Sequence, residues 1–183
     1  MTKDLIFDTE AIRILPMEEA HYQEVLRIHQ QGLQNGYSTF SVRSLTWSEL
    51  QTEKMAGQKL VAMINHDVVG WATLTPAFAR MAYRGVGEVS IYIDEAARGR
   101  KVGKTLLKAL IQSSEEGGLW ALHSLILPEN TGSIALHQAC GFREVGYFER
   151  IGFMSHGPLA GKWLNVLVFE RRSSKVGLDR ELV

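Results

Sequence analysis

The chain has 183 residues, of which 45% are hydrophobic and 22% are charged, a balance that suits one globular domain with a sizeable core. Twenty Lys and Arg residues balance twenty Asp and Glu residues, and zero formal net charge argues against general nucleic-acid binding, which needs a basic field. The one cysteine, Cys140, excludes an intrachain disulfide, and we expect it to pack in the core rather than to act as a nucleophile.

Hydrophobic periodicity divides the chain into strands and helices. In chain order we predict a strand at 11–15, a helix at 18–33, a second helix that a Thr46–Glu49 capping box begins, strands at 59–64, 68–75 and 86–93, a helix at 103–116, a strand at 121–127, a short helix at 130–141, and strands at 142–148 and 163–170. This order predicts one α/β domain, a mixed central sheet flanked by helices, over residues 1–183. Its core spans about 11–171, and a loosely ordered polar tail covers 172–183.

Two further exclusions follow from the sequence. No apolar run approaches the ~20 residues that cross a bilayer, and residues 1–7 lack the apolar core of a signal peptide, so we expect a cytoplasmic protein without a membrane partner. The six histidines are scattered and form no ligand pair, so no metal site is expected. His21 and His29 are expected on the outer part of the first helix.

A basic turn lies between the strand at 86–93 and the helix at 103–116. Its sequence is Arg98-Gly99-Arg100-Lys101-Val102-Gly103-Lys104. Free backbone N–H groups and partial positive charge at a helix N-terminus suit a phosphate group. The alternative is a solvated surface turn. Neither a Walker A loop nor a G-x-G-x-x-G fingerprint is present.

The order of elements, this turn and residues 130–142 together resemble the GNAT N-acetyltransferase superfamily. The pyrophosphate loop of that family, [QR]-x-x-G-x-[GA], is matched by Arg98-x-x-Lys101-x-Gly103, with lysine in place of the middle glycine. A positive φ there would cost stability. The resemblance implies a GNAT fold and acetyl-CoA as acetyl donor, with the backbone amides of about residues 102–104 on its pyrophosphate.

The resemblance also implies how the rest of the donor binds. Two neighbouring parallel strands of the fold, here residues 88–93 and 121–127, splay near their middles and admit the CoA arm. The backbone of Ile91, Tyr92 and Ile93 would then bond the pantetheine amides as an added strand does.

A second family signature is an asparagine that opens a helix ending in Gly-Phe, as Asn130, Ser133 and Gly141-Phe142 do here. The resemblance implies that Asn130 and Ser133 belong to the donor site. His137 stands where the family often has a tyrosine that protonates the leaving thiolate, and imidazole titrates near neutral pH. His137 is therefore either this general acid or a packed residue on the helix face.

Glu88 is a carboxylate in an otherwise apolar strand, and period-2 geometry puts it on one face with Ser90 and Tyr92. Acetyl transfer needs a neutral amine, and most amines are protonated at neutral pH, so a base must take the proton. Glu88 is the predicted base. The alternative is a structural carboxylate that pairs with Arg84.

A longer match covers most of residues 11–170 and resembles the phosphinothricin and methionine-sulfoximine acetyltransferase branch. It rests on residues 38–40, 82–85, 88–93, 133–137 and 161–165. The branch acetylates the α-amine of small amino acids, and it implies a homodimer with residues 147–163 as a contact surface. Asn165, where the branch often has aspartate, and residues 155–158 depart from the pattern.

An amino-acid acceptor needs a group that holds its carboxylate. Arg80 and Arg84 are the candidates, because guanidinium pairs bidentately with a carboxylate, and the alternative is a solvated loop. Thr39, Phe40 and Tyr83 are expected to wall the pocket.

Two other functions stay open at this point. One keeps the fold and changes the acceptor to a polyamine, a protein N-terminus or an aminoglycoside, although a cationic acceptor would want an acidic mouth rather than the arginines of residues 80–84. The other is a non-catalytic acetyl-CoA sensor, which would tolerate the loss of Glu88.

Overall fold

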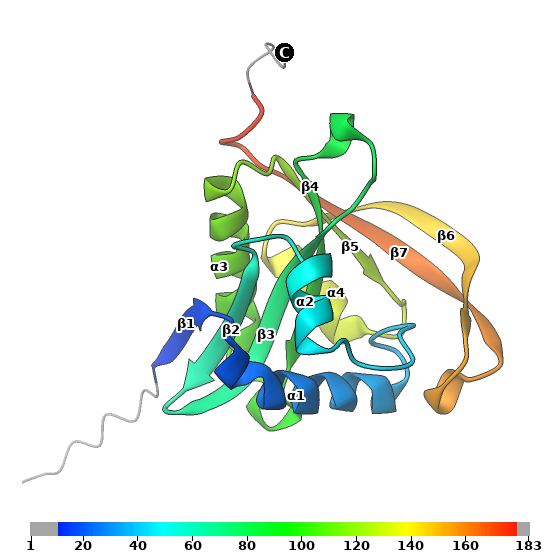
Figure 1. The fold of residues 1–183 in the computed structure, drawn as a ribbon. Helices are drawn as coiled ribbons and strands as arrows, with labels where there is room; N and C mark the ends of the chain where they lie inside the picture. The colour runs from blue at the N-terminus through cyan, green and yellow to red at the C-terminus, as the bar shows by residue number, and fades with distance from the viewer. Residues whose placement is uncertain (1–10, 179–183) are drawn as a thin grey trace, which may run out of the picture.

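The computed structural model describes residues 11–178, which form a seven-stranded sheet in the order β1-β2-β3-β4-β5-β7-β6 (Figure 1). The strands are β1 (Ile12–Pro16), β2 (Lys59–Ile64), β3 (Asp67–Pro76), β4 (Val86–Ile93), β5 (Ala121–Ile126), β6 (Arg143–Met154) and β7 (Lys162–Arg172), and the helices are α1 (Tyr22–Asn35), α2 (Trp47–Glu53), α3 (Val102–Glu116) and α4 (Thr131–Ala139). Their order along the chain is the predicted one. Residues 1–7, used above to argue against a signal peptide, lie outside the described residues, as does the end of the predicted tail.

Helices cover both faces of the sheet, with α1 and α2 on one side and α3 on the other (Figure 1). Apolar side chains of β2 alternate between these two faces. Leu60 and Ala62 pack with Leu106 of α3, whereas Val61 packs with Ile28 of α1. Successive strand residues point to opposite faces, so a run of apolar residues supplies two cores at once.

The helix boundaries follow local signals. Thr46 Oγ1 accepts the Glu49 N–H, and the Glu49 side chain accepts the Thr46 N–H at 2.7 Å, which is the predicted capping box. Gly36 ends α1 with φ 75°, a conformation that glycine adopts without steric cost.

The strands β4 and β5 are parallel and separate after three residues. Val86, Gly87 and Glu88 pair with Ala121, Leu122 and His123, and no later residue of β4 pairs with β5. Beyond this point β5 continues to pair with β7, while the edge of β4 that faces β5 is left open. The predicted splay is therefore present, and it begins directly after Glu88.

The last hairpin is longer than the predicted strands at 142–148 and 163–170. The strand β6 continues to Met154 past a register shift between Phe148 and Gly152. At this irregularity Arg150 has φ 47°, and its N–H donates to Asn165 Oδ1 at 2.8 Å. A bulge breaks the two-residue period, which is why the pattern alone predicted a shorter strand.

Two other predictions are wrong. The start of the tail is held against the sheet: Ser173 is buried, and Arg172 donates to the carbonyls of Trp120 and Val176 at 2.6 and 2.7 Å. His29 does not lie on the outer part of α1, because its side chain is only 8% exposed and contacts Trp71.

Candidate active site

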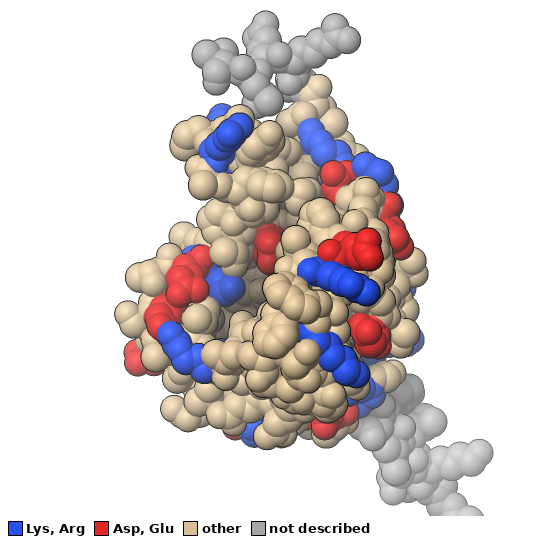
Figure 2. All heavy atoms as spheres, turned by 90° about the vertical axis from the view of Figure 1, so that its right-hand side faces the viewer, with Lys and Arg blue, Asp and Glu red and all other residues tan. Residues whose placement is uncertain are grey.

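A large cleft of about 1250 Å³ runs between α1, the splayed strands and the N-terminal ends of α3 and α4. Figure 2 shows a hollow on this side of the molecule, with both basic and acidic atoms visible inside it and at its rim. The cleft has two ends. Residues 98–99, 101–104 and 129–133 line one end, and Lys54, Thr75 and Glu88 line the other.

At the first end, the N-terminus of α3 presents unpaired backbone donors. The Thr105 N–H donates to Lys101 O at 3.1 Å, but the N–H groups of Val102, Gly103 and Lys104 have no acceptor among residues 11–178. Of the predicted basic turn, every residue except Arg100 lines the cleft. Free amides, the helix dipole and three cationic side chains make this end suitable for a diphosphate.

The backbone at Lys101 is left-handed, with φ 65° and ψ 6°. A side chain in this conformation is strained, so we expect Lys101→Gly to raise the free energy of unfolding by about 0.5–1 kcal/mol. The same substitution removes an ammonium from the cleft, and the KM for an anionic donor should rise a few-fold. Denaturant unfolding and donor kinetics measure the two effects, and a less stable variant would contradict the strain argument.

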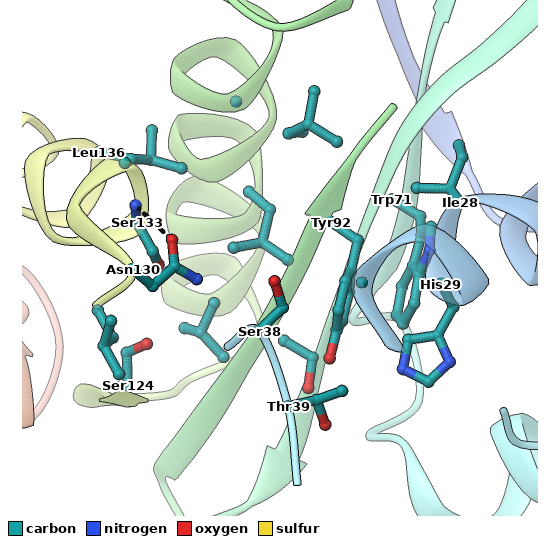
Figure 3. Close-up of a pocket in the computed structure, with 18 of the residues that line it drawn as sticks. Ile28, His29, Ser38, Thr39, Trp71, Tyr92, Ser124, Asn130, Ser133 and Leu136 are labelled. Atoms are coloured by element: carbon teal, nitrogen blue, oxygen red, sulfur yellow. Dashed lines mark hydrogen bonds between the residues drawn. The ribbon is translucent and has the colours of Figure 1, made fainter. Parts of the chain in front are cut away.

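Between the two ends, the open edge of β4 and the start of α4 face each other. Ile91, Tyr92 and Ile93 line the cleft along this edge, as predicted. Opposite them, Asn130 Oδ1 accepts the Ser133 N–H at 3.1 Å, the dashed contact in Figure 3, and the amide nitrogen of Asn130 points into the cleft. The unpaired strand edge and this amide suit an extended chain that carries its own amide groups.

His137 belongs to the same helix, α4, and its side chain is 1% exposed. Its Nδ1 is 2.8 Å from Ser133 O, so Nδ1 carries the proton, and Nε2 has no partner among the described residues. Burial lowers the pKa of His137, and its ring meets Phe142 edge to face at 4.9 Å. A neutral imidazole with its proton on Nδ1 has none at Nε2 to donate, so the geometry favours the packed residue over the acid.

Glu88 lines the cleft at the point where β4 and β5 part. Its neighbours in register are Thr75 on β3 and His123 on β5. The Glu88 carboxylate makes no ion pair or hydrogen bond with another described residue. Arg84, the alternative partner, instead places its guanidinium 5.7 Å from the centre of the Trp120 ring. No residue between 11 and 178 therefore occupies this carboxylate as a bonded partner.

The predicted acceptor residues divide into two groups. Thr39 and Phe40 line the cleft, and Phe40 packs against the β6–β7 hairpin. Arg80, Tyr83 and Arg84 do not line it: they belong to the exposed loop before β4, where Tyr83 packs on Phe78 with ring centres 5.0 Å apart. The structure thus does not bring the predicted arginine clamp to the site.

Sequence reasoning missed an aromatic wall at the centre of the cleft. Tyr92 stacks on Trp71 with ring centres 4.7 Å apart, and His29 meets the Tyr92 ring edge-on at 4.7 Å (Figure 3). Burial raises the pKa of Tyr92, and a hydrogen bond with Thr39 acts in the opposite direction. The Tyr92 hydroxyl points toward Thr39 (Figure 3). Part of the signal was available, because period 2 put Tyr92 on the face of Glu88. The partner ring was not predictable, because the pairing of Trp71 with Tyr92 depends on the register between β3 and β4.

Other chemistries find less support in the site. Burial raises the pKa of the Cys140 thiol, which disfavours the reactive thiolate. Among residues 11–178, no three His, Cys, Asp or Glu side chains lie together as metal ligands would. Within the same residues, no helix is both long and apolar enough to cross a membrane.

Comparison with known proteins identifies the family. The model of the acetyltransferase (GNAT) family matches residues 22–142, from the start of α1 to the residue before β6. This chain belongs to the GNAT family. The seven-stranded sheet and its parallel, splayed pair β4–β5 are the GNAT fold that the sequence resemblance predicted.

The relatives of this GNAT chain include the predicted branch. It is 37% identical over 114 residues to the phosphinothricin N-acetyltransferase of Alcaligenes faecalis, covering 61% of this chain and 55% of that protein. It is 31% identical over 100 residues to the L-methionine sulfoximine/L-methionine sulfone acetyltransferase of Pseudomonas paraeruginosa, covering 55% of each. The chain thus matches little more than half the length of these curated relatives.

Among solved structures, it resembles a GNAT superfamily phosphinothricin acetyltransferase from Sinorhizobium meliloti in complex with AcCoA. The TM-score is 0.80 at 27% identity, with 92% of each chain covered. A ribosomal-protein-alanine N-acetyltransferase from Brucella melitensis gives a TM-score of 0.78 at 28% identity, covering 88% of this chain and 99% of that one.

Proposed function

We propose that this protein is an acetyl-CoA-dependent N-acetyltransferase that acts on the α-amine of a small amino acid or an analogue of the phosphinothricin or methionine-sulfoximine type. One observation carries the proposal. The same cleft contains the unpaired amides of α3, the open edge of β4 and the carboxylate of Glu88, which has no hydrogen-bonded partner among the described residues. The branch of the curated relatives supports the amino-acid acceptor.

The residues at the donor end fit the donor that we propose. A diphosphate would lie at the N–H groups of residues 102–104 with Arg98, Lys101 and Lys104 around it. The pantetheine arm would follow the edge of β4 at Ile91–Ile93, with Asn130 and Ser133 across the cleft. Bound there, acetyl-CoA supplies an acetyl group activated as a thioester.

Glu88 would act as the base on the acceptor. It takes a proton from the ammonium group, directly or through water, so that the amine lone pair attacks the thioester carbonyl. The new C–N bond forms and the C–S bond breaks. The proton that the nitrogen then loses passes to the leaving thiolate, directly or through water, which gives the acetylated amine and coenzyme A as the free thiol. Since no activated cysteine is present among residues 11–178, direct attack is favoured over an acyl-enzyme route. His137 would position α4 rather than donate a proton.

A homodimer is also part of the proposal. Several large apolar side chains of the β6–β7 hairpin are exposed in the single chain, at Tyr147, Phe148, Ile151, Phe153 and Trp163. Apolar patches of this kind favour protein contacts. Sedimentation velocity tests the assembly, and a monomer at micromolar concentration would contradict it.

An acceptor panel tests the function. Purified protein is mixed with acetyl-CoA and single free amino acids, phosphinothricin, methionine sulfoximine or a polyamine, and released thiol is measured. We expect release with at least one amino acid or analogue, and acetylation at its α-nitrogen by mass spectrometry. Release with the polyamine alone would overturn the acceptor class, and tight CoA binding without any release would favour the sensor.

A further inference from the structure

Lys54 is a partly buried cation in the cleft, and the mechanism above gives it no role. It follows α2 directly, and its Nζ donates to Thr75 Oγ1 at 2.9 Å. Thr75 in turn pairs in register with Glu88 on the neighbouring strand. The next residue, Met55, donates its N–H to Leu74 O at 2.8 Å, which ties this part of the chain to β3. The ammonium is thus held on the wall beside the proposed base.

The charge of Lys54 is not neutralised inside the protein. No carboxylate among residues 11–178 forms an ion pair with it. Burial lowers the pKa of Lys54. The negative charges of Glu53 and Glu88 oppose this effect, although neither carboxylate forms an ion pair with the ammonium. Moving a cation away from water is costly unless an anion lies nearby. An anionic ligand in the cleft would supply the missing partner.

The other cations of the described residues are less suited to bind an anion at this end. Both Arg43 amino groups donate to Glu49, at 2.9 and 2.7 Å, so that guanidinium is already paired. Arg98, Lys101 and Lys104 line the opposite end of the cleft. Those of the 77–85 loop, where the clamp was predicted, do not line it. Lys54 is left as the cation next to Glu88.

We propose that Lys54 binds the α-carboxylate of the acceptor and so selects α-amino acids over simple amines. The assignment rests on the proposed function and deepens it. An α-amino acid carries an ammonium and a carboxylate on one carbon, and Glu88 and Lys54 offer the opposite charges on adjacent parts of the cleft wall. The lysine ammonium is a compact charge with three donors, so it can bond one carboxylate oxygen while Thr75 holds it in place.

A cycle of two proteins, the wild type and Lys54→Met, and two substrates tests this assignment. The substrates are one amino acid that the wild type acetylates and the α-carboxamide of the same amino acid, which keeps the amine and lacks the charge. For Lys54→Met we expect kcat/KM to fall roughly 10- to 100-fold with the free acid, mostly through KM. With the carboxamide it should change less than about three-fold.

Two further variants guard against a merely structural effect. Lys54→Arg keeps the charge and should restore much of the preference for the free acid. Lys59→Met removes a lysine of β2 that does not line the cleft, and it should leave both substrates unaffected. Far-UV circular dichroism and thermal unfolding show whether each variant is folded.

The possible failures are distinguishable. Equal losses with the acid and the carboxamide, or no loss with the acid, would overturn the role of Lys54 while the acetyltransferase proposal stands. A wild type that acetylates no amino acid would overturn the proposed function and the assignment with it.

Discussion

Glu88→Gln should lower kcat about 100- to 10,000-fold, the usual contribution of a general base. The substitution keeps the size and hydrogen-bonding capacity of the side chain and removes its ability to take a proton. Glu88 stands at the last paired position of β4 and β5, with no internal cation bonded to it, so this loss should reflect chemistry rather than a broken ion pair. Steady-state kinetics with an accepted amino acid measure the effect.

Two controls make this result specific. The Kd for coenzyme A, measured by calorimetry, should stay within about two-fold of the wild type, because the base lies away from the amides of α3. Glu129→Gln alters an exposed carboxylate at the opposite end of the cleft from the partly buried Glu88, and it should leave kcat nearly unchanged. Turnover by Glu88→Gln close to the wild-type rate would remove Glu88 from the role of base.

His29 should make the fold sensitive to acid. The side chain is buried on α1, its Nδ1 is 2.7 Å from Ser44 Oγ, and burial together with the positive charge of Lys54 lowers the pKa of His29 to about 4. The unfolded chain binds this proton near pH 6.5, so it holds more protons than the folded state between these values. The free energy of unfolding should therefore fall by about 3 kcal/mol as the pH drops from 6.5 to 4.

Denaturant unfolding at pH 7, 5.5 and 4 measures this loss. In His29→Gln the part that belongs to this residue should disappear, so the variant should show a flatter dependence on pH. The lowered pKa of His137 contributes loss in the same direction in both proteins, and so does not affect the difference. Parallel curves for the two proteins would contradict a neutral, buried His29.

Much of the fold could be predicted because local signals agreed with the global pattern. The capping box at Thr46 and Glu49, the left-handed Gly36 and the apolar run of β4 each fix an element within a few residues. The basic turn was also predictable, since strand, glycines and helix occur in fixed order. The splay needed the family resemblance, because pairing between distant strands leaves no mark in local periodicity.

The acceptor side was harder to predict because it is built from contacts between distant segments. Lys54 and Glu88 are 34 positions apart in the sequence, and they come near each other because Lys54 bonds Thr75 of β3, which pairs with Glu88 of β4. His29 seemed to belong to a solvated helix face until the packing of Trp71 and Tyr92 enclosed it. Conversely, Arg84 matched a branch motif, yet the structure places its guanidinium at Trp120. Motif position alone does not determine which way a loop side chain points.

A crystal structure of this protein with coenzyme A tests the central claim most directly. We predict the diphosphate at the amides of residues 102–104, the arm along the edge of β4, and the sulfur beside Glu88. A diphosphate bound elsewhere, or a sulfur far from the Glu88 carboxylate, would contradict the account.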